Sequence, residues 1–321
     1  MTASLFAAVE MAPRDPILGL TESFNADSRT TKVNLGVGVY LDESGKVPLL
    51  TAVKLAEKSR LEAIPARGYQ PIEGLAAYNQ IVQQLLFGAG SPLLEAGRVL
   101  TIEALGGTGA LKVGADYLRR LLPDATVYLS DPSWENHRAL FETAGFPVET
   151  YPYYDAATRG VNFVAMKAGL NVLPAGSIVV LHACCHNPTG ADLDEAQWQE
   201  VIEVIGARGL LAFVDIAYQG FADGIGEDAV ALRLFAASGL QFLVASSFSK
   251  SFSLYGERVG ALSVVTASRD ESARVLSQIK RLVRTNYSSP PTHGGAVVAA
   301  VLASPELRQL WEEELAEMRV R

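Results

Sequence analysis

A single lysine stands in the stretch SSFSKSFSLYGERVG, among serines and phenylalanines rather than among other charges. Lys250 follows an apolar run, which places it just beyond the carboxyl end of a predicted strand, and Arg258 comes eight residues later. A partly desolvated lysine has a lowered pKa and becomes a nucleophile towards carbonyl carbons. Ser247, Ser249 and Arg258 carry donors that suit an anion. The alternative is an ordinary surface loop in which the arginine is an ion-pair partner.

A second stretch, EALGGTGALKVGADYL, brings several glycines to the point where a predicted strand passes into a helix. Glycine lets the backbone approach a ligand, and a helix N-terminus offers unpaired N–H groups with a partial positive charge. The run Gly106, Gly107, Thr108 and Gly109 is therefore a candidate anion cradle. The stretch matches neither the dinucleotide fingerprint nor the P-loop, because Lys112 comes too late and no serine or threonine follows it. A plain strand-to-helix turn is the alternative.

A carboxylate closes the apolar run LLAFVD, and Tyr218 follows Asp215 by three residues. A carboxylate at the end of a buried strand is costly unless a cation or several donors meet it. Asp215 therefore awaits a cationic ligand group, or else serves as a helix cap or in a structural ion pair. Asn187, in the turn NPTG after another predicted strand, is either a turn former or a polar contact at the strand ends, where open parallel sheets bind ligands.

Residues of metal-ligand types also occur together in LHACCHNPTG, which contains His182, Cys184, Cys185 and His186. Adjacent residues of an extended segment point to opposite faces, so the two cysteines are not expected to share one ion. We therefore predict no metal site.

Composition disfavours several classes of protein. The 321 residues are 49% hydrophobic and 19% charged, which suffices for a large core and more than one domain. The net charge is −8 with scattered lysines and arginines, so nucleic acid is not an expected partner. The longest apolar runs are too short to span a bilayer, and no secretory signal is visible. Two adjacent cysteines do not suit a disulfide framework, so a cytoplasmic protein is predicted.

Short apolar runs alternate with helical patterns, which predicts an α/β fold with a mainly parallel sheet covered by helices. A helix is predicted over Ala110–Leu122, and a hairpin around Asp42–Gly45 within a separate N-terminal part. The predicted strands are Val99–Glu103, Thr126–Leu129, Ser177–His182, Leu211–Asp215, Phe242–Ala245 and Ala261–Val265.

A final helix is predicted from Pro305, with Ser304 as its N-cap. No glycine, asparagine or proline stops it, so the chain is expected to end inside a helix whose apolar face needs a partner that is missing. The apolar stripe of this helix consists of Leu307, Leu310, Trp311, Leu315 and Met318.

An anion cradle, an aspartate at a strand end and a lysine beside serine and arginine together match what pyridoxal phosphate requires. Its aldehyde takes a lysine as a Schiff base, its pyridinium nitrogen needs a carboxylate, and its phosphate needs helix N–H groups with an arginine.

With these residues the chain resembles the class I aminotransferases of pyridoxal-phosphate fold type I, in the branch of the aspartate and aromatic amino acid aminotransferases and nearest to the aromatic (tyrosine) enzymes. The resemblance implies a mostly parallel seven-stranded sheet sandwiched by helices, and an incomplete small domain. Its parts would be an arm at 1–14, the start of the small domain at 15–47, a large cofactor-binding domain at 48–303 and the start of an interdomain helix at 304–321. The matching motifs, from about Asp15 to Arg321, are DPILGL, NLGVGVY, GGTGALK, SDPSWENH, CCHNPTG, DIAYQGF, SFSKSFSLYGERVGA and NYSSPP.

The resemblance also implies roles for single residues. Lys250 would form the internal aldimine and later move the proton between substrate and cofactor. Asp215 would pair with the pyridinium nitrogen, supported by His137, and Asn187 and Tyr218 would contact the phenolic oxygen. The other implied cofactor contacts are Trp134 on the ring, and Gly107, Thr108, Ser247, Arg258 and Tyr69 of the partner subunit on the phosphate.

The implied activity is transamination of aromatic amino acids, aspartate or both, with 2-oxoglutarate. The chain would form a homodimer in which Arg284 reaches across the interface to the distal carboxylate of a dicarboxylic substrate, with Ser288 nearby. The implied substrate contacts are Val37, Gly38, Trp134, Asn187, Arg284 and Ser288.

The sequence departs from the family pattern in two places. The chain ends before the segment that supplies the arginine for the substrate α-carboxylate, and Glu103 stands near the cradle where relatives often have glutamine, which is expected to weaken phosphate binding slightly. The alternative is therefore a truncated, dimer-forming protein that binds pyridoxal phosphate with little or no transaminase activity. A nucleotide-dependent oxidoreductase is disfavoured because no dinucleotide fingerprint is present.

Overall fold

The computed structural model describes residues 4–12, 18–34, 36, 38–63 and 68–320. Contacts divide the chain into two units, Met1–Pro48 and Leu49–Arg321, which are described separately. In the first unit, α1 spans Leu18–Ala26, and a later turn is closed by the Gly45 N–H, which donates to the Asp42 carbonyl at 2.9 Å. The described residues of this unit form no strand, so the predicted hairpin is wrong beyond its turn. An isolated two-stranded hairpin is marginally stable at best.

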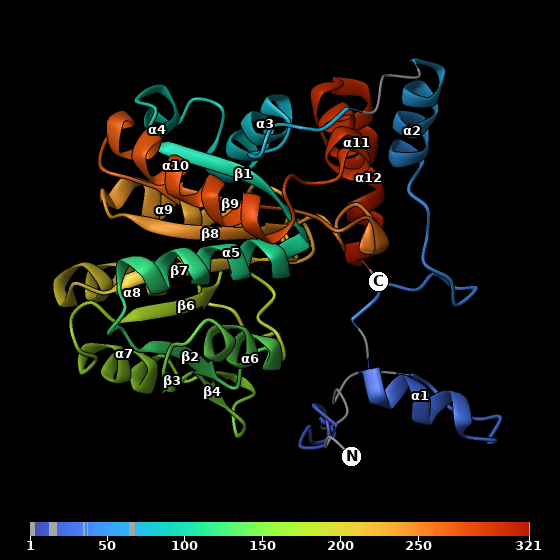
Figure 1. The fold of residues 1–321 in the computed structure, drawn as a ribbon. Coiled ribbons are helices and arrows are strands. Elements are labelled where there is room, and N and C mark those ends of the chain that lie inside the picture. Colours follow the sequence, from blue (N-terminus) through green and yellow to red (C-terminus); the bar gives the residue numbers. More distant parts are fainter. Residues whose placement is uncertain (1–3, 13–17, 35, 37, 64–67, 321) are drawn as a thin grey trace. The chain divides into compact units, whose positions relative to one another are not determined.

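The second unit is built on a seven-stranded sheet in the order β1-β9-β8-β7-β6-β2-β3 (Figure 1). β9 runs antiparallel to both of its neighbours, and the other neighbouring strands pair in parallel. The strands are β1 (Val99–Leu105), β2 (Val127–Asp131), β3 (Val148–Pro152), β6 (Ile178–His182), β7 (Leu211–Ile216), β8 (Phe242–Ser247) and β9 (Val259–Val265). The six predicted strands are thus all present, and a two-stranded hairpin of β4 (Tyr154–Asp155) and β5 (Gly160–Val161) accompanies them.

Helices cover both faces of this sheet, as the sequence pattern predicts (Figure 1). α5 packs on β1, β7, β8 and β9 and is flanked by α6 and α10, whereas α3, α9, α8 and α7 follow one another on the other face. None of the helices in the described ranges combines the length and the hydrophobicity that a membrane span requires. The helices are α2 (Thr51–Ala63), α3 (Ala76–Phe87), α4 (Pro92–Glu95), α5 (Gly106–Leu121), α6 (Glu135–Thr143), α7 (Phe163–Asn171), α8 (Glu195–Arg208), α9 (Val230–Ser238), α10 (Arg269–Asn286), α11 (Thr292–Ala303) and α12 (Pro305–Val320).

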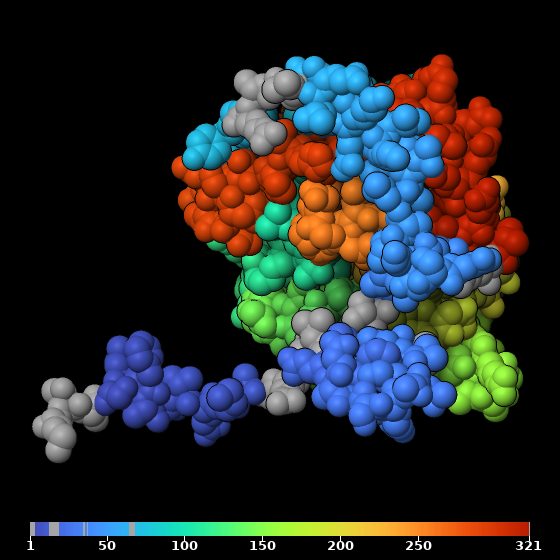
Figure 2. All heavy atoms as spheres, turned by 90° about the vertical axis from the view of Figure 1, so that its right-hand side faces the viewer, coloured from blue at the N-terminus to red at the C-terminus, as the bar shows by residue number. Residues whose placement is uncertain are grey.

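The predicted C-terminal helix is α12, and its apolar stripe has partners within the same unit. It packs against α2 and α11, which lie beside it in Figure 2. Trp311 is 1% exposed, stacks on Phe252 at a centroid distance of 4.7 Å and donates its indole N–H to the Ser251 carbonyl at 2.6 Å. Trp311, Leu315 and Met318 of the stripe are thus buried within the unit, whereas Leu307 and Leu310 are half-buried, and the expectation of a further partner for this face stays a prediction.

Candidate active site

The carboxyl ends of β1, β2, β6, β7 and β8 meet at one edge of the sheet. β1 and β8 are each antiparallel to β9, so they point the same way, and the other strands run parallel to β8. Because β9 runs in the opposite sense, the residue that precedes it also lies at this edge. The predicted site residues found here are Gly107 and Thr108 after β1, Trp134 and His137 after β2, Asn187 after β6, Asp215 and Tyr218 at the end of β7, Ser247 and Lys250 at the end of β8, and Arg258 just before β9.

Asp215 is held by a chain of hydrogen bonds. The Asn187 backbone N–H donates to His182 Nδ1 at 3.3 Å, so His182 carries its proton on Nε2, which lies 3.3 Å from Ser133 Oγ. Ser133 Oγ can then donate to His137 Nδ1 at 3.0 Å, and His137 Nε2 donates to Asp215 Oδ2 at 3.0 Å. This order of donors fixes the orientation of the carboxylate.

The other oxygen of Asp215 is available. The residue is 8% exposed, and its Oδ1 is buried without a hydrogen-bond partner among the described residues. A buried acceptor without a donor is costly, so such an atom usually awaits a group that is not part of the chain. The geometry suits a cationic N–H.

The Lys250 ammonium lies 4.7 Å from the centroid of the Tyr218 ring. Burial lowers the pKa of Lys250 below its ordinary value, and Arg258 adds to this effect against the opposing charge of Asp215. Burial, followed by the negative charge of Asp215, raises the pKa of the Tyr218 hydroxyl. Lys250 therefore loses its proton more readily than an exposed lysine, and Tyr218 keeps its own.

The start of α5 forms a concave surface of backbone N–H groups. Leu105 is the N-cap residue and provides no side-chain acceptor, so the first N–H groups of the helix remain available. Gly106 has φ +69°, and a Cβ there would collide with the Arg258 guanidinium. A Cβ on Gly107 would lie 3.1 Å from the Ser247 Cβ. Both glycines are thus needed for the helix to begin this close to the β8–β9 segment.

The Arg258 guanidinium completes the surface. Its Nη1 donates to Ser249 Oγ at 3.3 Å and to the Tyr255 carbonyl at 3.0 Å, and its Nη2 lies beside Gly106. A helix N-terminus with an adjacent guanidinium and two serines is an anion site of the kind that binds phosphate.

Three predicted residues of the second unit, Tyr69, Arg284 and Ser288, are not part of this cluster in their own chain. Tyr69 is 97% exposed and therefore contacts no residue of the cluster. Arg284 is exposed and donates from Nη1 to Ser288 Oγ at 2.6 Å. Gly38 is exposed in the first unit, and Val37 lies outside the described residues.

The hydrogen-bond network that holds Asp215 contains two residues that were not predicted as site residues, Ser133 and His182. His182 was considered only as a metal ligand. The sequence placed His182 at the end of a predicted strand, and the register of the neighbouring strands β6 and β7 sets it beside Asp215. Burial, and then the neighbouring His137 and His186, lowers the pKa of His182 well below its ordinary value, so the ring is neutral.

The geometric argument against a metal at the two cysteines is wrong. Cys185 has φ +49°, and the two thiols and the Asp228 carboxylate lie within 4.8 Å of one another. The Asp228 oxygens, however, accept four backbone N–H groups at 2.7 to 3.2 Å. Hydrogen bonding to Cys185, followed by burial, raises the pKa of the Cys184 thiol well above its ordinary value. A carboxylate that anchors a loop and a thiol that keeps its proton are poor metal ligands.

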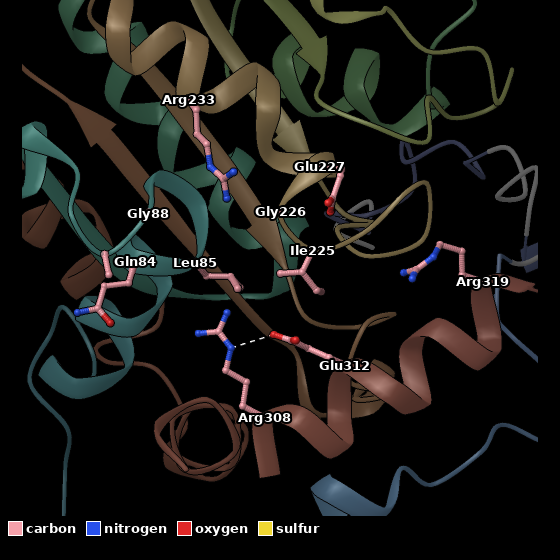
Figure 3. Close-up of a pocket in the computed structure, with 11 residues that line it drawn as sticks. Gln84, Leu85, Gly88, Ile225, Gly226, Glu227, Arg233, Arg308, Glu312 and Arg319 are labelled. Carbon is pink, nitrogen blue, oxygen red and sulfur yellow. Dashed lines mark hydrogen bonds and ion pairs between the residues drawn. The ribbon is translucent and has the colours of Figure 1, made fainter. Parts of the chain in front are cut away.

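A pocket of about 440 Å³ lies between α3, the loop before α9, and α12 (Figure 3). Arg308 and Glu312, one turn apart on α12, form an ion pair on its wall at 2.9 Å, and Arg319 donates to the Gly220 carbonyl at 2.6 Å. Its described lining contains none of the predicted site residues and no lysine, cysteine or histidine. It is separate from the cluster around Lys250.

Comparisons with known proteins agree with this arrangement. The sequence profile of "Aminotransferase class I and II" matches residues 30–321. The chain belongs to this aminotransferase family. An aspartate aminotransferase of Pseudomonas aeruginosa is 71% identical to this aminotransferase over 99% of the chain and 80% of the relative, and an aromatic-amino-acid aminotransferase of Escherichia coli is 55% identical over the same shares. A crystal structure of an aromatic-amino-acid aminotransferase from Burkholderia pseudomallei, covalently bound to pyridoxal phosphate, superimposes with a TM-score of 0.97 at 69% identity, over 99% of the chain and 80% of that structure. The expected fold type I architecture is thereby confirmed.

The residues of this aminotransferase fit pyridoxal phosphate. The buried Oδ1 of Asp215 has no donor within the ranges that the structure describes, and a pyridinium N–H would supply one. The glycine-lined start of α5 leaves space that a Cβ would fill, next to Arg258. Lys250 is the amine of this edge, and its lowered pKa suits attachment to an aldehyde.

Proposed function

We propose that the chain is a pyridoxal-phosphate-dependent aminotransferase that accepts aromatic amino acids and aspartate, with 2-oxoglutarate as the amino-group acceptor. The observation that carries this proposal is the buried Oδ1 of Asp215, which has no hydrogen-bond partner in the described part of the chain, at the same sheet edge as a lysine with a lowered pKa. A carboxylate for a ring nitrogen and an amine for an aldehyde are the two groups that this cofactor chemistry requires of a protein.

When bound, the cofactor supplies an electron-withdrawing ring that stabilises negative charge on the substrate Cα. Asp215 would hold a proton on the ring nitrogen by accepting its N–H with Oδ1, while His137 holds Oδ2 in place. Asn187 and Tyr218 would bind the phenolic oxygen, and Trp134 would cover the ring.

Proton transfer would fall to Lys250. Its Nζ takes a proton from Cα as the free amine, and the lowered pKa makes that form available at a lower pH than for an exposed lysine. The N–H groups of Gly107 and Thr108, with Ser247 and Arg258, would hold the phosphate, which fixes the reacting atoms relative to Nζ.

Aspartate and aromatic amino acids are both proposed as substrates, because two proteins of similar identity to this chain are named for one or the other. The 71% identical relative is named for aspartate and the 69% identical structure for aromatic amino acids. Arg284 would bind the distal carboxylate of aspartate and 2-oxoglutarate and turn aside for an aromatic ring. Val37, Gly38 and Ser288 are the other proposed substrate contacts.

A homodimer is proposed because Tyr69, Arg284 and Ser288 do not join the Lys250 cluster of their own chain. The 97% exposure of Tyr69 supports its use by another subunit, whose phosphate it would bind. We also propose four parts of the chain. The arm is 1–14, the first part of the small domain is 15–47, the large domain is 48–303, and the start of the interdomain helix is 304–321. We further propose a cytoplasmic location, which suits the two free thiols.

The decisive experiment is borohydride reduction of the purified protein followed by peptide mapping. The cofactor is expected on Lys250, and addition of glutamate before reduction is expected to prevent its attachment. The variant Lys250→Ala is expected to lose both attachment and transamination, whereas Lys167→Met, a surface change on α7, should keep both. Attachment at another lysine, or none, would rule the proposed site out.

A further inference from the structure

A short segment before α3 connects the surface residue Tyr69 to the body of the second unit. Although Tyr69 is almost fully exposed, the residues that follow it are fixed from two sides. Gln70 and Glu73 supply most of these contacts. We call the segment 69–75 the Tyr69 segment.

The first side is strand β1. The Glu103 N–H donates to the Glu73 carbonyl at 2.9 Å, and the Gly74 N–H closes a turn on the Pro71 carbonyl at 2.9 Å. The Leu75 N–H donates to Glu103 Oε2 at 3.3 Å. Gly74 has φ +88°, and a Cβ there would overlap the Glu103 side chain, so the turn and the strand fit closely.

The second side is formed by α10 and the start of α11. The Glu73 carboxylate lies 2.7 Å from Lys280 Nζ, and Gln70 Nε2 donates to the Pro291 carbonyl at 3.0 Å. Lys280 precedes Arg284 by four residues, so the two side chains share one face of α10. The segment is thus attached to the helix face that carries Arg284.

Arg284 is fixed in turn at the end of the same helix. It donates to Ser288 Oγ at 2.6 Å, and Ser288, with φ +70°, donates its N–H to the Val283 carbonyl at 3.1 Å. Pro291, the acceptor for Gln70, follows three residues later. The chain from Arg284 through Ser288 to Pro291 therefore lies between the two attachments of the Tyr69 segment.

We propose that Gln70, Glu73 and Lys280 are positioning residues that fix Tyr69 relative to Arg284, so that one subunit presents both side chains to its partner's active site at a set spacing. This inference rests on the proposed function, in which Tyr69 binds the phosphate and Arg284 the distal carboxylate. Its consequence is that cofactor retention and recognition of acidic substrates depend on the same ion pair.

The size of the effect follows from the exposure of the pair. The Glu73 and Lys280 side chains are 29% and 34% exposed, so water screens their attraction. Breaking such a pair is expected to change affinities by about threefold to tenfold rather than to abolish binding.

The test compares the holoenzymes of Glu73→Gln, Lys280→Met and the charge-reversed double variant Glu73→Lys/Lys280→Glu. Each single variant is expected to release pyridoxal phosphate about threefold to tenfold faster and to raise KM for aspartate by a similar factor. Values of kcat, and KM for phenylalanine, should stay within about twofold, and the reversed pair should restore both affected constants. A general loss of structure would not separate the two substrates in this way.

The matched control is Lys167→Met, which breaks the ion pair between Lys167 and Glu200 at 2.5 Å, with side chains 43% and 44% exposed, between α7 and α8. It should change none of these constants. Cofactor release is also measured for Tyr69→Phe, and sedimentation of each variant shows whether it remains a dimer.

Two results would overturn the inference in distinguishable ways. If Tyr69→Phe releases the cofactor faster but Glu73→Gln does not, the ion pair does not position Tyr69, and the proposed function stands. If Tyr69→Phe itself changes nothing, the role proposed for Tyr69 fails and the positioning role falls with it. Dissociation of the Glu73→Gln protein into monomers would assign the pair to assembly instead.

Discussion

Arg284 is a residue whose removal should separate the two proposed substrates. We expect Arg284→Leu to lower kcat/KM for aspartate by about a hundredfold to a thousandfold, because a bidentate carboxylate–guanidinium contact is lost, and to leave kcat/KM for phenylalanine within about threefold. Steady-state kinetics on both amino acids, with 2-oxoglutarate held saturating, measure this. Equal losses on both substrates would show that Arg284 does not switch between them.

Glu103 makes the stability of the protein depend on pH. It is 2% exposed, and burial raises the pKa of its carboxyl to about 7, from an ordinary 4.5. The folded chain thus holds this proton more tightly than the unfolded chain, so the contribution of Glu103 to stability is fully present below pH 4.5 and is lost as pH rises through about 7. The facing Tyr78 and Tyr287 hydroxyls have raised pKa values, through burial first and the Glu103 charge second, and supply no positive charge.

We expect Glu103→Gln to remove this pH dependence. Relative to the natural chain, its free energy of unfolding should rise by about 3 kcal/mol between pH 4.5 and pH 8, because the amide can still accept from Leu75 without becoming charged. Denaturant unfolding at several pH values measures the difference. Parallel stability curves for the two proteins would show that Glu103 is not the titrating group.

The placement of Lys250 and Asp215 at one sheet edge was predictable, because each stands where an apolar run ends. The face of the sheet to which a side chain points was harder to predict. Glu103 was expected near the phosphate cradle, but its side chain points away from α5, towards Gly74 and Gly295, while its neighbours Ile102 and Ala104 face the core with α5. Alternation along β1 fixes this, and it becomes visible only once the covering helices are known.

At the scale of elements, α12 supports the loop that carries Lys250. Trp311 packs on Phe252 and bonds to Ser251, the two residues that follow Lys250. We expect Trp311→Ala to lower the free energy of unfolding by about 3–5 kcal/mol, and Trp311→Phe, which keeps the stacking, by about 1–2 kcal/mol. Denaturant unfolding measures both, with Leu121→Ala, at a 57% exposed position on α5, as the control. A loss no larger than that of the control would contradict the supporting role.

The elements themselves were largely predictable because most strands of a covered sheet are continuous apolar runs. β3 was not, since Glu149 and Thr150 are exposed on this edge strand and interrupt the pattern. The helix predicted from Ala110 begins at Gly106, because glycines weaken the helical signal although the structure uses them in the first turn. In each case tertiary contacts override the local pattern.

At the scale of the whole molecule, the proposed dimer can be tested by complementation. Lys250→Ala and Arg284→Leu subunits each lack one group, so a hybrid dimer with contributions across the interface contains one intact site. With random mixing we expect about a quarter of the natural aspartate activity, although each variant alone is nearly inactive. Co-expression with two affinity tags yields the hybrid for assay. No recovery in purified hybrids would mean that Arg284 acts within its own subunit.

The reversed direction of β9 has a consequence for the length of the ligand that the site accepts. Lys250 and Arg258 lie on one short connection between adjacent strands, so the proposed attachment point and the proposed phosphate contact are a fixed number of residues apart. Because β8 and β9 hold both ends of this loop, its length limits the distance between Lys250 and Arg258. Inserting even one residue between Lys250 and Arg258 would change the distance between these two side chains. The size of the cofactor that the proposed site accepts therefore depends on the length of this loop as well as on its side chains.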